Sequence, residues 1–226
     1  MNTFLQDSSL LVGSPEEIKA LACKESAEVL VVSDSHGAYA SLFLILKQFG
    51  GCCDALIFCG DGICDIAKLV EDALRDSSIQ SFVPPVIGIV EGNNDADLYP
   101  VKNPASGSPC YVEFKIPLCN SVEVCGHKIF FTHGHRNSLF NGNGEIVSLA
   151  KESGCEIALY GHTHVAFERL CSGGIFALNP GSCSKPRGGQ KPSFAVIALK
   201  KNSASFESTF FEISASGIRP FFPGGT

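Results

Sequence analysis

The fold is decided by the run Val29-Leu30-Val31-Val32, which the motif Asp34-Ser35-His36 follows almost at once. A continuous β-branched and leucine-containing run predicts a strand that is buried on both faces. Further apolar runs alternate with helical patterns along the first half of the chain. They predict, in order, a helix over 38–49, a strand over 55–59, a helix over 64–76 and a strand over 85–90. This alternation predicts parallel strands with helices covering the sheet, and therefore an α/β fold.

The second half of the chain has a different pattern, which begins after Leu98. We expect the Pro/Ser/Gly-rich residues 99–110 to form a loop and residues 144–153 to form a helix. The other residues form short strand-like runs, with the clearest hairpin turn at Gly173-Gly174. These runs are 111–116, 121–125, 127–132, 156–160, 165–170, 174–178, 194–199 and 205–213. A half rich in crossovers before a half rich in hairpins predicts two packed sheets with helices outside.

The chain has no internal repeat and no linker long enough to separate two domains. We therefore expect one domain over residues 1–226, with its core at about 28–213. A short amphipathic helix over 15–24, with Ser14 as its N-cap, is expected before the first strand. The tail 215–226, which is rich in Gly and Pro, is expected to be loosely ordered.

The composition excludes several classes of protein. The 226 residues are 45% hydrophobic and 18% charged, which is the balance of a folded chain and not of a disordered one. The net charge of −6 argues against a general nucleic-acid binder, since such proteins neutralise phosphates with Lys and Arg. A small phosphoester substrate stays compatible, because bound divalent cations can supply positive charge locally. No apolar stretch approaches the roughly 20 residues of a membrane span, so we expect no membrane partner; a homo-oligomer is left open.

The eleven cysteines favour a reducing compartment. Several of them, such as Cys59 and Cys125, lie within apolar strand-like runs, where a free thiol behaves as a small buried hydrophobic group. A structural zinc site is the alternative, but such sites draw their ligands from tight pairs and the chain contains no CxxC pair. The first 13 residues contain no Lys or Arg and no signal-peptide core. We therefore expect a cytoplasmic protein.

Five of the six histidines fall in three short motifs, and each motif follows an apolar run. Two further runs end in Gly60-Asp61 and Gly92-Asn93, so five predicted strands deliver polar side chains to one edge of a sheet. These side chains are Asp34, His36, Asp61, Asn93, His133, His162 and His164. Carboxylate, imidazole and amide oxygen suit borderline divalent cations. A helix cap or a turn explains any one motif, but not two His-x-His pairs at strand ends.

These motifs and their order resemble the calcineurin-like metallophosphoesterases over residues of about 28–200. The matching motifs are Asp34-x-His36, Gly60-Asp61, Gly92-Asn93-x-Asp95, His133-Gly134-His135 and Gly161-His162-x-His164. The stretches Thr132-His133-Gly134-His135 and Asn179-Pro180-Gly181-Ser182 further resemble the small bacterial and archaeal phosphodiesterases related to the retromer subunit Vps29. The resemblance implies a four-layer αββα sandwich of two mixed sheets flanked by helices, with a dinuclear metal centre between the sheets.

The resemblance also implies a division of the ligands between two divalent metal ions. The first ion would be held by Asp34, His36, Asp61 and His164. Asp61 would bridge to the second ion, which Asn93, His133 and His162 complete. We expect Mn²⁺ first, with Fe²⁺, Ni²⁺, Zn²⁺ and Mg²⁺ as alternatives. A bridging hydroxide would then attack phosphorus, which makes the expected activity a metal-dependent phosphoester hydrolysis.

One departure from the family pattern concerns catalysis. Many members carry a histidine after the motif asparagine, and this chain has Asn94 there. Leaving-group protonation would then fall to His36, to His135 or to a metal-bound water, so we take His36, Asn94 and His135 as catalytic candidates. Substrates with good leaving groups should be favoured, and diesters over monoesters. A phosphomonoesterase acting on nucleotides or phosphoproteins, and a Vps29-like interaction scaffold, are the alternative functions.

Other polar residues carry weaker expectations. Asp65 and Asp95 are helix caps, surface charges or supports of the metal ligands. The basic residues after the Asn179-Pro180-Gly181-Ser182 stretch either meet a second phosphate of the substrate or form a solvated loop. They are Lys185, Arg187 and Lys191. His127, which follows Gly126, is expected to be a structural residue of a hairpin turn.

Overall fold

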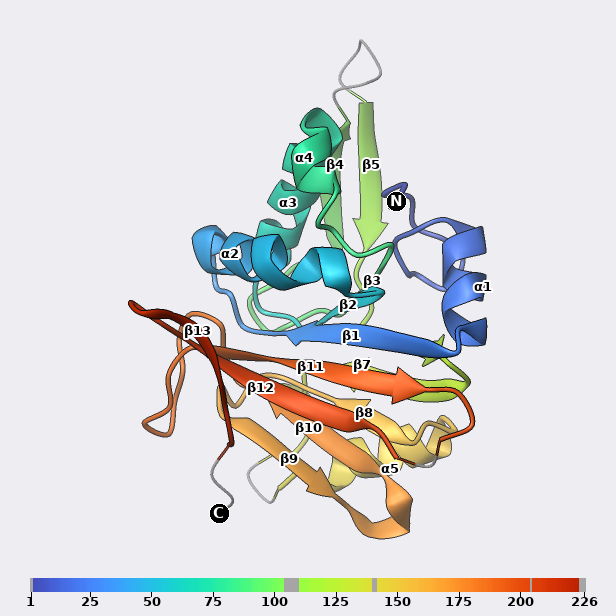
Figure 1. Cartoon of the computed structure of the whole chain (residues 1–226), viewed down its shortest axis with the longest axis vertical. Helices are drawn as coiled ribbons and strands as arrows, with labels where there is room; N and C mark the ends of the chain where they lie inside the picture. Colours follow the sequence, from blue (N-terminus) through green and yellow to red (C-terminus); the bar gives the residue numbers. More distant parts are fainter. Residues whose placement is uncertain (1, 104–109, 140–141, 204, 224–226) are drawn as a thin grey trace.

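The computed structural model describes residues 2–103, 110–139, 142–203 and 205–223, which form two facing sheets with helices outside them (Figure 1). The first sheet has the strand order β13-β12-β11-β1-β2-β3, and the second has the order β6-β7-β8-β10-β9. The strands of the first sheet are β1 (Ser26–Val32), β2 (Ala55–Phe58), β3 (Val86–Ile89), β11 (Ser193–Lys200), β12 (Glu207–Ser214) and β13 (Gly217–Phe221). Those of the second are β6 (Cys119–Val124), β7 (His127–Thr132), β8 (Ile157–Leu159), β9 (Ala166–Leu170) and β10 (Phe176–Pro180).

The helices lie on the outer faces of the two sheets. Helices α2 (Tyr39–Phe49) and α3 (Ile63–Arg75) cover the first sheet, and α5 (Gly144–Glu152) covers the second (Figure 1). Helix α1 (Pro15–Cys23) contacts β3 and β6, and the side chain of Ser14 caps it by accepting from the backbone N–H of Glu17 at 3.1 Å. A one-turn helix, α4 (Ser77–Gln80), follows α3. The predicted αββα sandwich is confirmed, and both of its sheets are mixed.

The alternation of residues along β1 explains the layering. Leu30 and Val32 belong to the core beneath α2 and α3, whereas Val29 and Val31 belong to the core between the sheets. Successive side chains of a strand point to opposite faces, so a strand between two cores must be apolar at every position. β1 runs parallel to β2, and β2 runs parallel to β3, as the α/β pattern predicts.

The predicted loop over 99–110 is wrong for its described part. Residues Leu98–Asn103 form β4, which pairs antiparallel with β5 (Cys110–Lys115) in a separate two-stranded sheet. Val101 and Phe114 are buried in the core that includes α3, and this burial holds the strand pair on the domain. Pro100 does not prevent a strand here, because an edge strand tolerates a missing N–H. Residues 104–109 of the predicted loop lie outside the described part of the chain.

Two further predictions need correction. The tail was expected to be loose from 215, but Gly217–Phe221 form the edge strand β13, which pairs antiparallel with β12. Its turn uses Gly217 at a φ of 113°. His127 was expected in a turn, but it begins β7, and the turn is made by Cys125 and Gly126. Its structural role is confirmed, since its ring bonds to Glu156 at 2.5 Å and to the carbonyl of Lys200 at 2.9 Å.

Candidate metal centre

The carboxyl ends of β1, β2 and β3 face those of β7 and β8, and the candidate ligands lie in the loops that follow these strands. Several of these residues have left-handed backbone conformations. Their φ angles are 56° at Asp34, 48° at His36, 56° at Asp61, 65° at His162 and 60° at His164. Such angles are uncommon for residues with a Cβ and cost free energy, so they cluster at functional sites. The backbone strain is concentrated on the residues that the motifs singled out.

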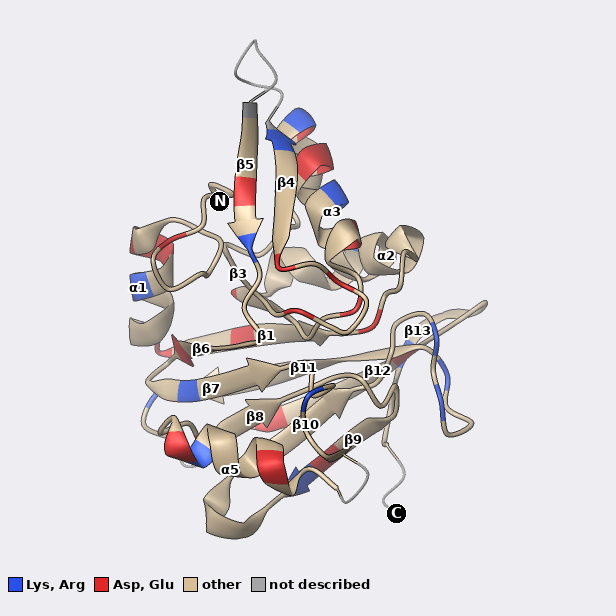
Figure 2. Ribbon diagram, turned by 180° about the vertical axis from the view of Figure 1, so that it is seen from behind, with Lys and Arg blue, Asp and Glu red and all other residues tan. Residues whose placement is uncertain are grey.

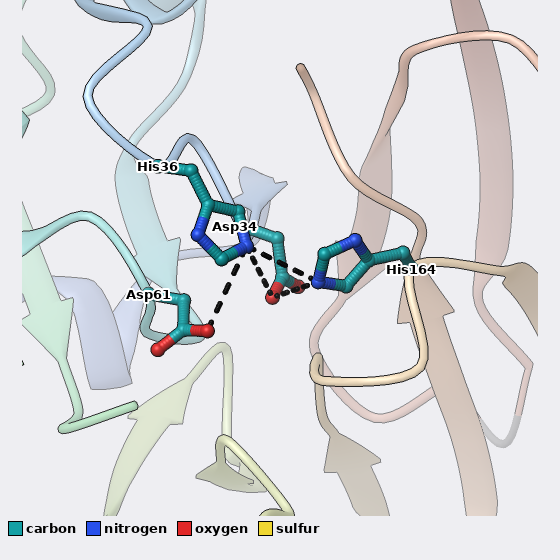
Figure 3. Close-up of side chains that lie close together, drawn as sticks. All are labelled: Asp34, His36, Asp61 and His164. Atoms are coloured by element: carbon teal, nitrogen blue, oxygen red, sulfur yellow. Dashed lines mark hydrogen bonds and ion pairs between the residues drawn. The ribbon is translucent and has the colours of Figure 1, made fainter. Parts of the chain in front are cut away.

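Four side chains converge on a single point (Figure 3). Nε2 of His164 lies 3.1 Å from Oδ1 of Asp34 and 3.2 Å from Nε2 of His36. Nε2 of His36 lies 3.8 Å from the same oxygen of Asp34 and 3.6 Å from Oδ2 of Asp61. One ligand atom from each of the four lies within 4.8 Å of the others, so the group could hold one metal ion.

A second group of side chains adjoins the first through Asp61. Oδ1 of Asn93 lies 3.2 Å from Nε2 of His133 and 3.0 Å from Nδ1 of His162. Oδ2 of Asp61, which is 3.6 Å from His36, is also 3.6 Å from Nε2 of His133. One carboxylate oxygen therefore faces both groups, which is the geometry that a bridging ligand requires.

The hydrogen bonds of two histidines indicate which nitrogen is free for a metal. Nδ1 of His133 bonds to the carbonyl of Cys59 at 2.7 Å, and Nδ1 of His164 bonds to the carbonyl of Lys185 at 2.6 Å. A carbonyl only accepts, so each Nδ1 carries the proton and each neutral ring directs an Nε2 lone pair toward Asp34 or Asp61. Oδ1 of Asp34 is buried and accepts no hydrogen bond. Lone pairs and carboxylate oxygens that face one another fit a bound cation.

The electrostatics of the site agree with this arrangement. Without a metal, contact with the Asp34 carboxylate favours the protonated ring of His164 and raises its pKa. Burial alone would lower the pKa of His133, but contact with Asp61 and the charges of Asp34 and Asp61 outweigh it and raise that pKa. Burial would raise the pKa of Asp61, yet contact with His133 and the hydrogen bonds from Asn94 hold it well below its usual range. The two carboxylates therefore favour a positive charge at the position where the imidazole nitrogens meet.

Asp95 holds the loop that carries Asp61. Its Oδ2 accepts from the backbone N–H groups of Asp61 at 2.6 Å and Gly92 at 3.0 Å. Its Oδ1 accepts from the backbone N–H groups of Gly62 at 3.0 Å and Ile63 at 2.9 Å, where α3 begins. One carboxylate thus satisfies donors at the amino end of a helix and fixes the backbone beside a candidate ligand.

Asp65 supports the loop after β1 in a similar way. It accepts from the hydroxyl of Ser35 at 2.5 Å and from the backbone N–H of Gly37 at 3.0 Å. Both neighbours flank His36, so Asp65 fixes the backbone that presents this imidazole. The sequence left its role open between a cap, a surface charge and a support, and the structure gives it the role of a support.

The Asn179-Pro180-Gly181-Ser182 stretch also supports the ligand loops. Nδ2 of Asn179 donates to the carbonyl of Gly161 at 2.7 Å, beside His162. The hydroxyl of Ser182 donates to the carbonyl of Asp34 at 2.7 Å. Sequence reasoning identified the stretch only as a family feature, because its partners lie far away along the chain.

Two glycines are required here by close packing and not by their φ angles. A Cβ on Gly92 would lie 2.2 Å from Oδ1 of Asp61, and a Cβ on Gly161 would lie 2.1 Å from the hydroxyl oxygen of Ser33. That hydroxyl donates to Oδ2 of Asp34 at 2.6 Å. The approach of neighbouring side chains is therefore what requires a glycine at these two positions.

The two remaining catalytic candidates occupy different positions. Asn94 donates to Asp61 twice, from its backbone N–H at 2.8 Å and from its side chain at 2.7 Å. The ring of His135 has its centroid 5.4 Å from that of His133, and its buried Nδ1 has no hydrogen-bond partner. Burial and the neighbouring His133 lower the pKa of His135, so its ring is mainly neutral at pH 7.

Comparison with known proteins identifies the family. Residues 28–202 match the calcineurin-like phosphoesterase superfamily domain. The chain belongs to this superfamily. A probable metallophosphoesterase of Bacillus subtilis strain 168, YsnB, is 28% identical to it over 177 residues, which are 78% of this chain and 87% of that protein. The phosphodiesterase YfcE of Escherichia coli K12 is 40% identical over 72 residues, but these are only 31% of this chain and 34% of YfcE.

Two solved structures have a similar fold. A conserved protein from Streptococcus pneumoniae TIGR4, described as a predicted phosphoesterase, superimposes with a TM-score of 0.59 at 27% identity, over 88% of this chain and 99% of that one. Vps29 from Cryptosporidium parvum gives a TM-score of 0.64 at 19% identity, over 88% and 97% of the two chains, which establishes a common fold alone. The predicted resemblance to the small phosphodiesterases related to Vps29 is confirmed. No helix in the described part of the chain could span a membrane.

Proposed function

We propose that this protein is a metal-dependent phosphodiesterase with a dinuclear metal centre. The observation that carries the proposal is the position of Asp61, whose Oδ2 faces His36 and His133 at the same distance of 3.6 Å. In this proposal Asp34, His36 and His164 complete the first metal site, and the second is formed by Asn93, His133 and His162. Two divalent cations at such a centre would supply a water of lowered pKa and positive charge for the phosphoryl oxygens.

The protein's own groups prepare this chemistry. The carbonyls of Cys59 and Lys185 fix the tautomers of His133 and His164, so that each Nε2 is a free lone pair. Asn94 fixes the carboxylate of Asp61 from one side, and His133 faces it from the other. Held in this way, the ligands need little reorganisation when charge develops on a phosphoryl group.

The state of the candidate general acids supports diesters with good leaving groups. Burial lowers the pKa of His36 and of His135, so the imidazolium form, which is the stronger acid, is less populated at neutral pH than in a free histidine. Asn94 has no ionisable group, and its amide is already bonded to Asp61. A substrate whose leaving group is stable as an anion needs a general acid least. We therefore propose diesters of weakly basic alcohols or phenols as the preferred substrates.

The test is hydrolysis of bis-p-nitrophenyl phosphate against p-nitrophenyl phosphate. The metal-depleted protein is refilled separately with Mn²⁺, Ni²⁺, Zn²⁺ and Mg²⁺ before each assay. Metal-dependent hydrolysis that is faster for the diester than for the monoester supports the proposal, and we expect Mn²⁺ to be among the active ions. Faster hydrolysis of the monoester would indicate a phosphomonoesterase. Two bound ions without turnover of either ester would contradict the enzymatic proposal and favour a scaffold.

A further inference from the structure

The loop between β10 and β11 brings two basic residues beside the metal centre. Its backbone is bound to His164 at two points, since the carbonyl of Lys185 accepts from Nδ1 of His164 at 2.6 Å and the N–H of Arg187 donates to the carbonyl of His164 at 3.0 Å. Figure 2, which colours basic residues blue, shows this loop near β13, at the end of the sandwich toward which β1 points. The positions of Lys185 and Arg187 are therefore tied to a candidate metal ligand.

The start of the loop is also bound to the loop that follows β1. The hydroxyl of Ser184 donates to the carbonyl of Asp34 at 3.0 Å and to that of Ser35 at 2.8 Å. The N–H of Lys185 donates to the hydroxyl of Ser182 at 2.8 Å. Farther along, the side chain of Gln190 pairs with the backbone of Ala166 at 2.6 and 3.1 Å. A loop anchored at this many points presents its side chains from a fixed backbone.

Two of the three cations of the loop are not paired with any carboxylate of the described residues. Lys185 and Arg187 are exposed, and neither forms an ion pair with any carboxylate of the described residues. Lys191 of the same loop differs, because its Nζ lies 3.0 Å from Oε1 of Glu212. Both unpaired cations are therefore carried by a backbone that bonds directly to His164, a member of the first metal group.

We propose that Lys185 and Arg187 form a subsite for a second phosphate of the substrate, next to the phosphodiester that is cleaved. The inference rests on the proposed function and names its substrate class, a phosphodiester with a further phosphate group. Unpaired cations on a fixed loop bind a phosphate without breaking an internal ion pair. Arg187 can bind two phosphate oxygens at once, whereas Lys185 supplies a point charge.

The test uses two nucleotides that differ by one phosphate. Binding of thymidine 3′,5′-bisphosphate and of thymidine 5′-monophosphate to the Mn²⁺-loaded protein is measured by titration calorimetry. We expect the bisphosphate to bind about tenfold more tightly in wild type, which is the order expected for two exposed charge contacts. The ratio of the two affinities, bisphosphate over monophosphate, should fall toward one in K185A/R187A and also in K185Q/R187Q. Lys191→Ala is the matched control and should keep the wild-type ratio.

Two results would overturn the inference: an equal affinity of wild type for both nucleotides, or a preference that survives in both double variants. The wild-type preference should also shrink between 50 and 500 mM salt, since exposed charge contacts are screened at distances of roughly 10 Å or less. Turnover of bis-p-nitrophenyl phosphate is assayed on the same preparations. Selective binding without turnover would refute the proposed function alone, and turnover without selectivity would refute the subsite alone.

Discussion

Asn94 and Asp61 are joined by two hydrogen bonds, one from the backbone N–H of Asn94 at 2.8 Å and one from its side-chain amide at 2.7 Å. Each bond goes to a different oxygen of the Asp61 carboxylate. Many members of the superfamily carry a histidine at the position of Asn94. In this protein the residue orients a carboxylate that faces two groups of candidate metal ligands, and it is not a source of protons.

Asn94→Ala should therefore weaken metal binding. The variant keeps the backbone bond to Asp61 but loses the side-chain bond, so the carboxylate is held less well. Loss of such an outer hydrogen bond costs about 10- to 100-fold in metal affinity or activity. Calorimetric titration with Mn²⁺ measures the affinity, and the pH profile of turnover tests the role. If Asn94 supplied a proton instead, the variant would bind Mn²⁺ normally and lose turnover only on substrates with poor leaving groups.

Asp95→Asn should destabilise the loop that carries Asp61. Asp95 accepts four backbone hydrogen bonds through two oxygens, and an amide offers only one acceptor oxygen. We expect a loss of about 1–3 kcal/mol in the free energy of unfolding and a weaker affinity for Mn²⁺. Urea unfolding gives the first quantity and calorimetry the second. Asp97→Asn is the control, since Asp97 is exposed and should change neither.

Metal binding should weaken as the pH falls. His133 and His164 must be neutral to bind a cation, and both have raised pKa values, so protons begin to compete close to neutral pH. Below those pKa values, affinity should fall by about tenfold per pH unit for each proton displaced. Dissociation constants for Mn²⁺ at pH 8, 7, 6 and 5.5 measure the effect.

In the metal-free chain, protonation of His133 and His164 at low pH stabilises the fold, whereas it opposes metal binding in the loaded protein. A pKa that is raised by folding contributes stability that is present at low pH and is lost as the pH rises through the folded value. Thermal unfolding of the metal-free protein should therefore show this contribution fading toward pH 8. A dissociation constant for Mn²⁺ that stays constant between pH 8 and 5.5 would contradict the assignment of these two histidines.

The cysteines should take no part in turnover. Burial raises the pKa of Cys53 to about 12, and it also raises the pKa of Cys59 and of Cys183 above the usual range. Iodoacetamide should therefore label exposed thiols such as Cys23 and Cys52 in the native protein and leave the buried ones unmodified. Peptide mass spectrometry locates the labels, with urea-unfolded protein as the control in which all cysteines react. Loss of turnover after labelling at the exposed sites would argue for a thiol in the mechanism.

The sequence predicts the convergence of the candidate ligands better than it predicts the edges of the fold. Buried parallel strands are continuous apolar runs, and their carboxyl ends meet at one edge, so the grouping of Asp34, Asp61 and His133 follows from local pattern. The strands β4 and β13 were missed because Pro100 and Pro220 resemble loop residues, although both lie in edge strands where a missing N–H is tolerated.

The supports of the site could not be predicted from local pattern. Asp95 bonds to backbone groups about 30 residues earlier in the chain, and Ser182 bonds to the carbonyl of Asp34 across 148 residues. Such partners are set by the packing of the two sheets, which no periodicity encodes. The close approach that requires Gly161 has the same origin, since it depends on Ser33 of another loop.

The central claim is a dinuclear centre bridged by Asp61, and the most direct test is turnover of bis-p-nitrophenyl phosphate as a function of Mn²⁺ bound per chain. The account predicts that wild type binds two ions and that turnover rises as the second is filled. Asp61→Asn should remain folded by circular dichroism and lose metal-dependent turnover by about 100-fold or more. Full turnover with a single bound ion, or retained turnover in Asp61→Asn, would contradict it.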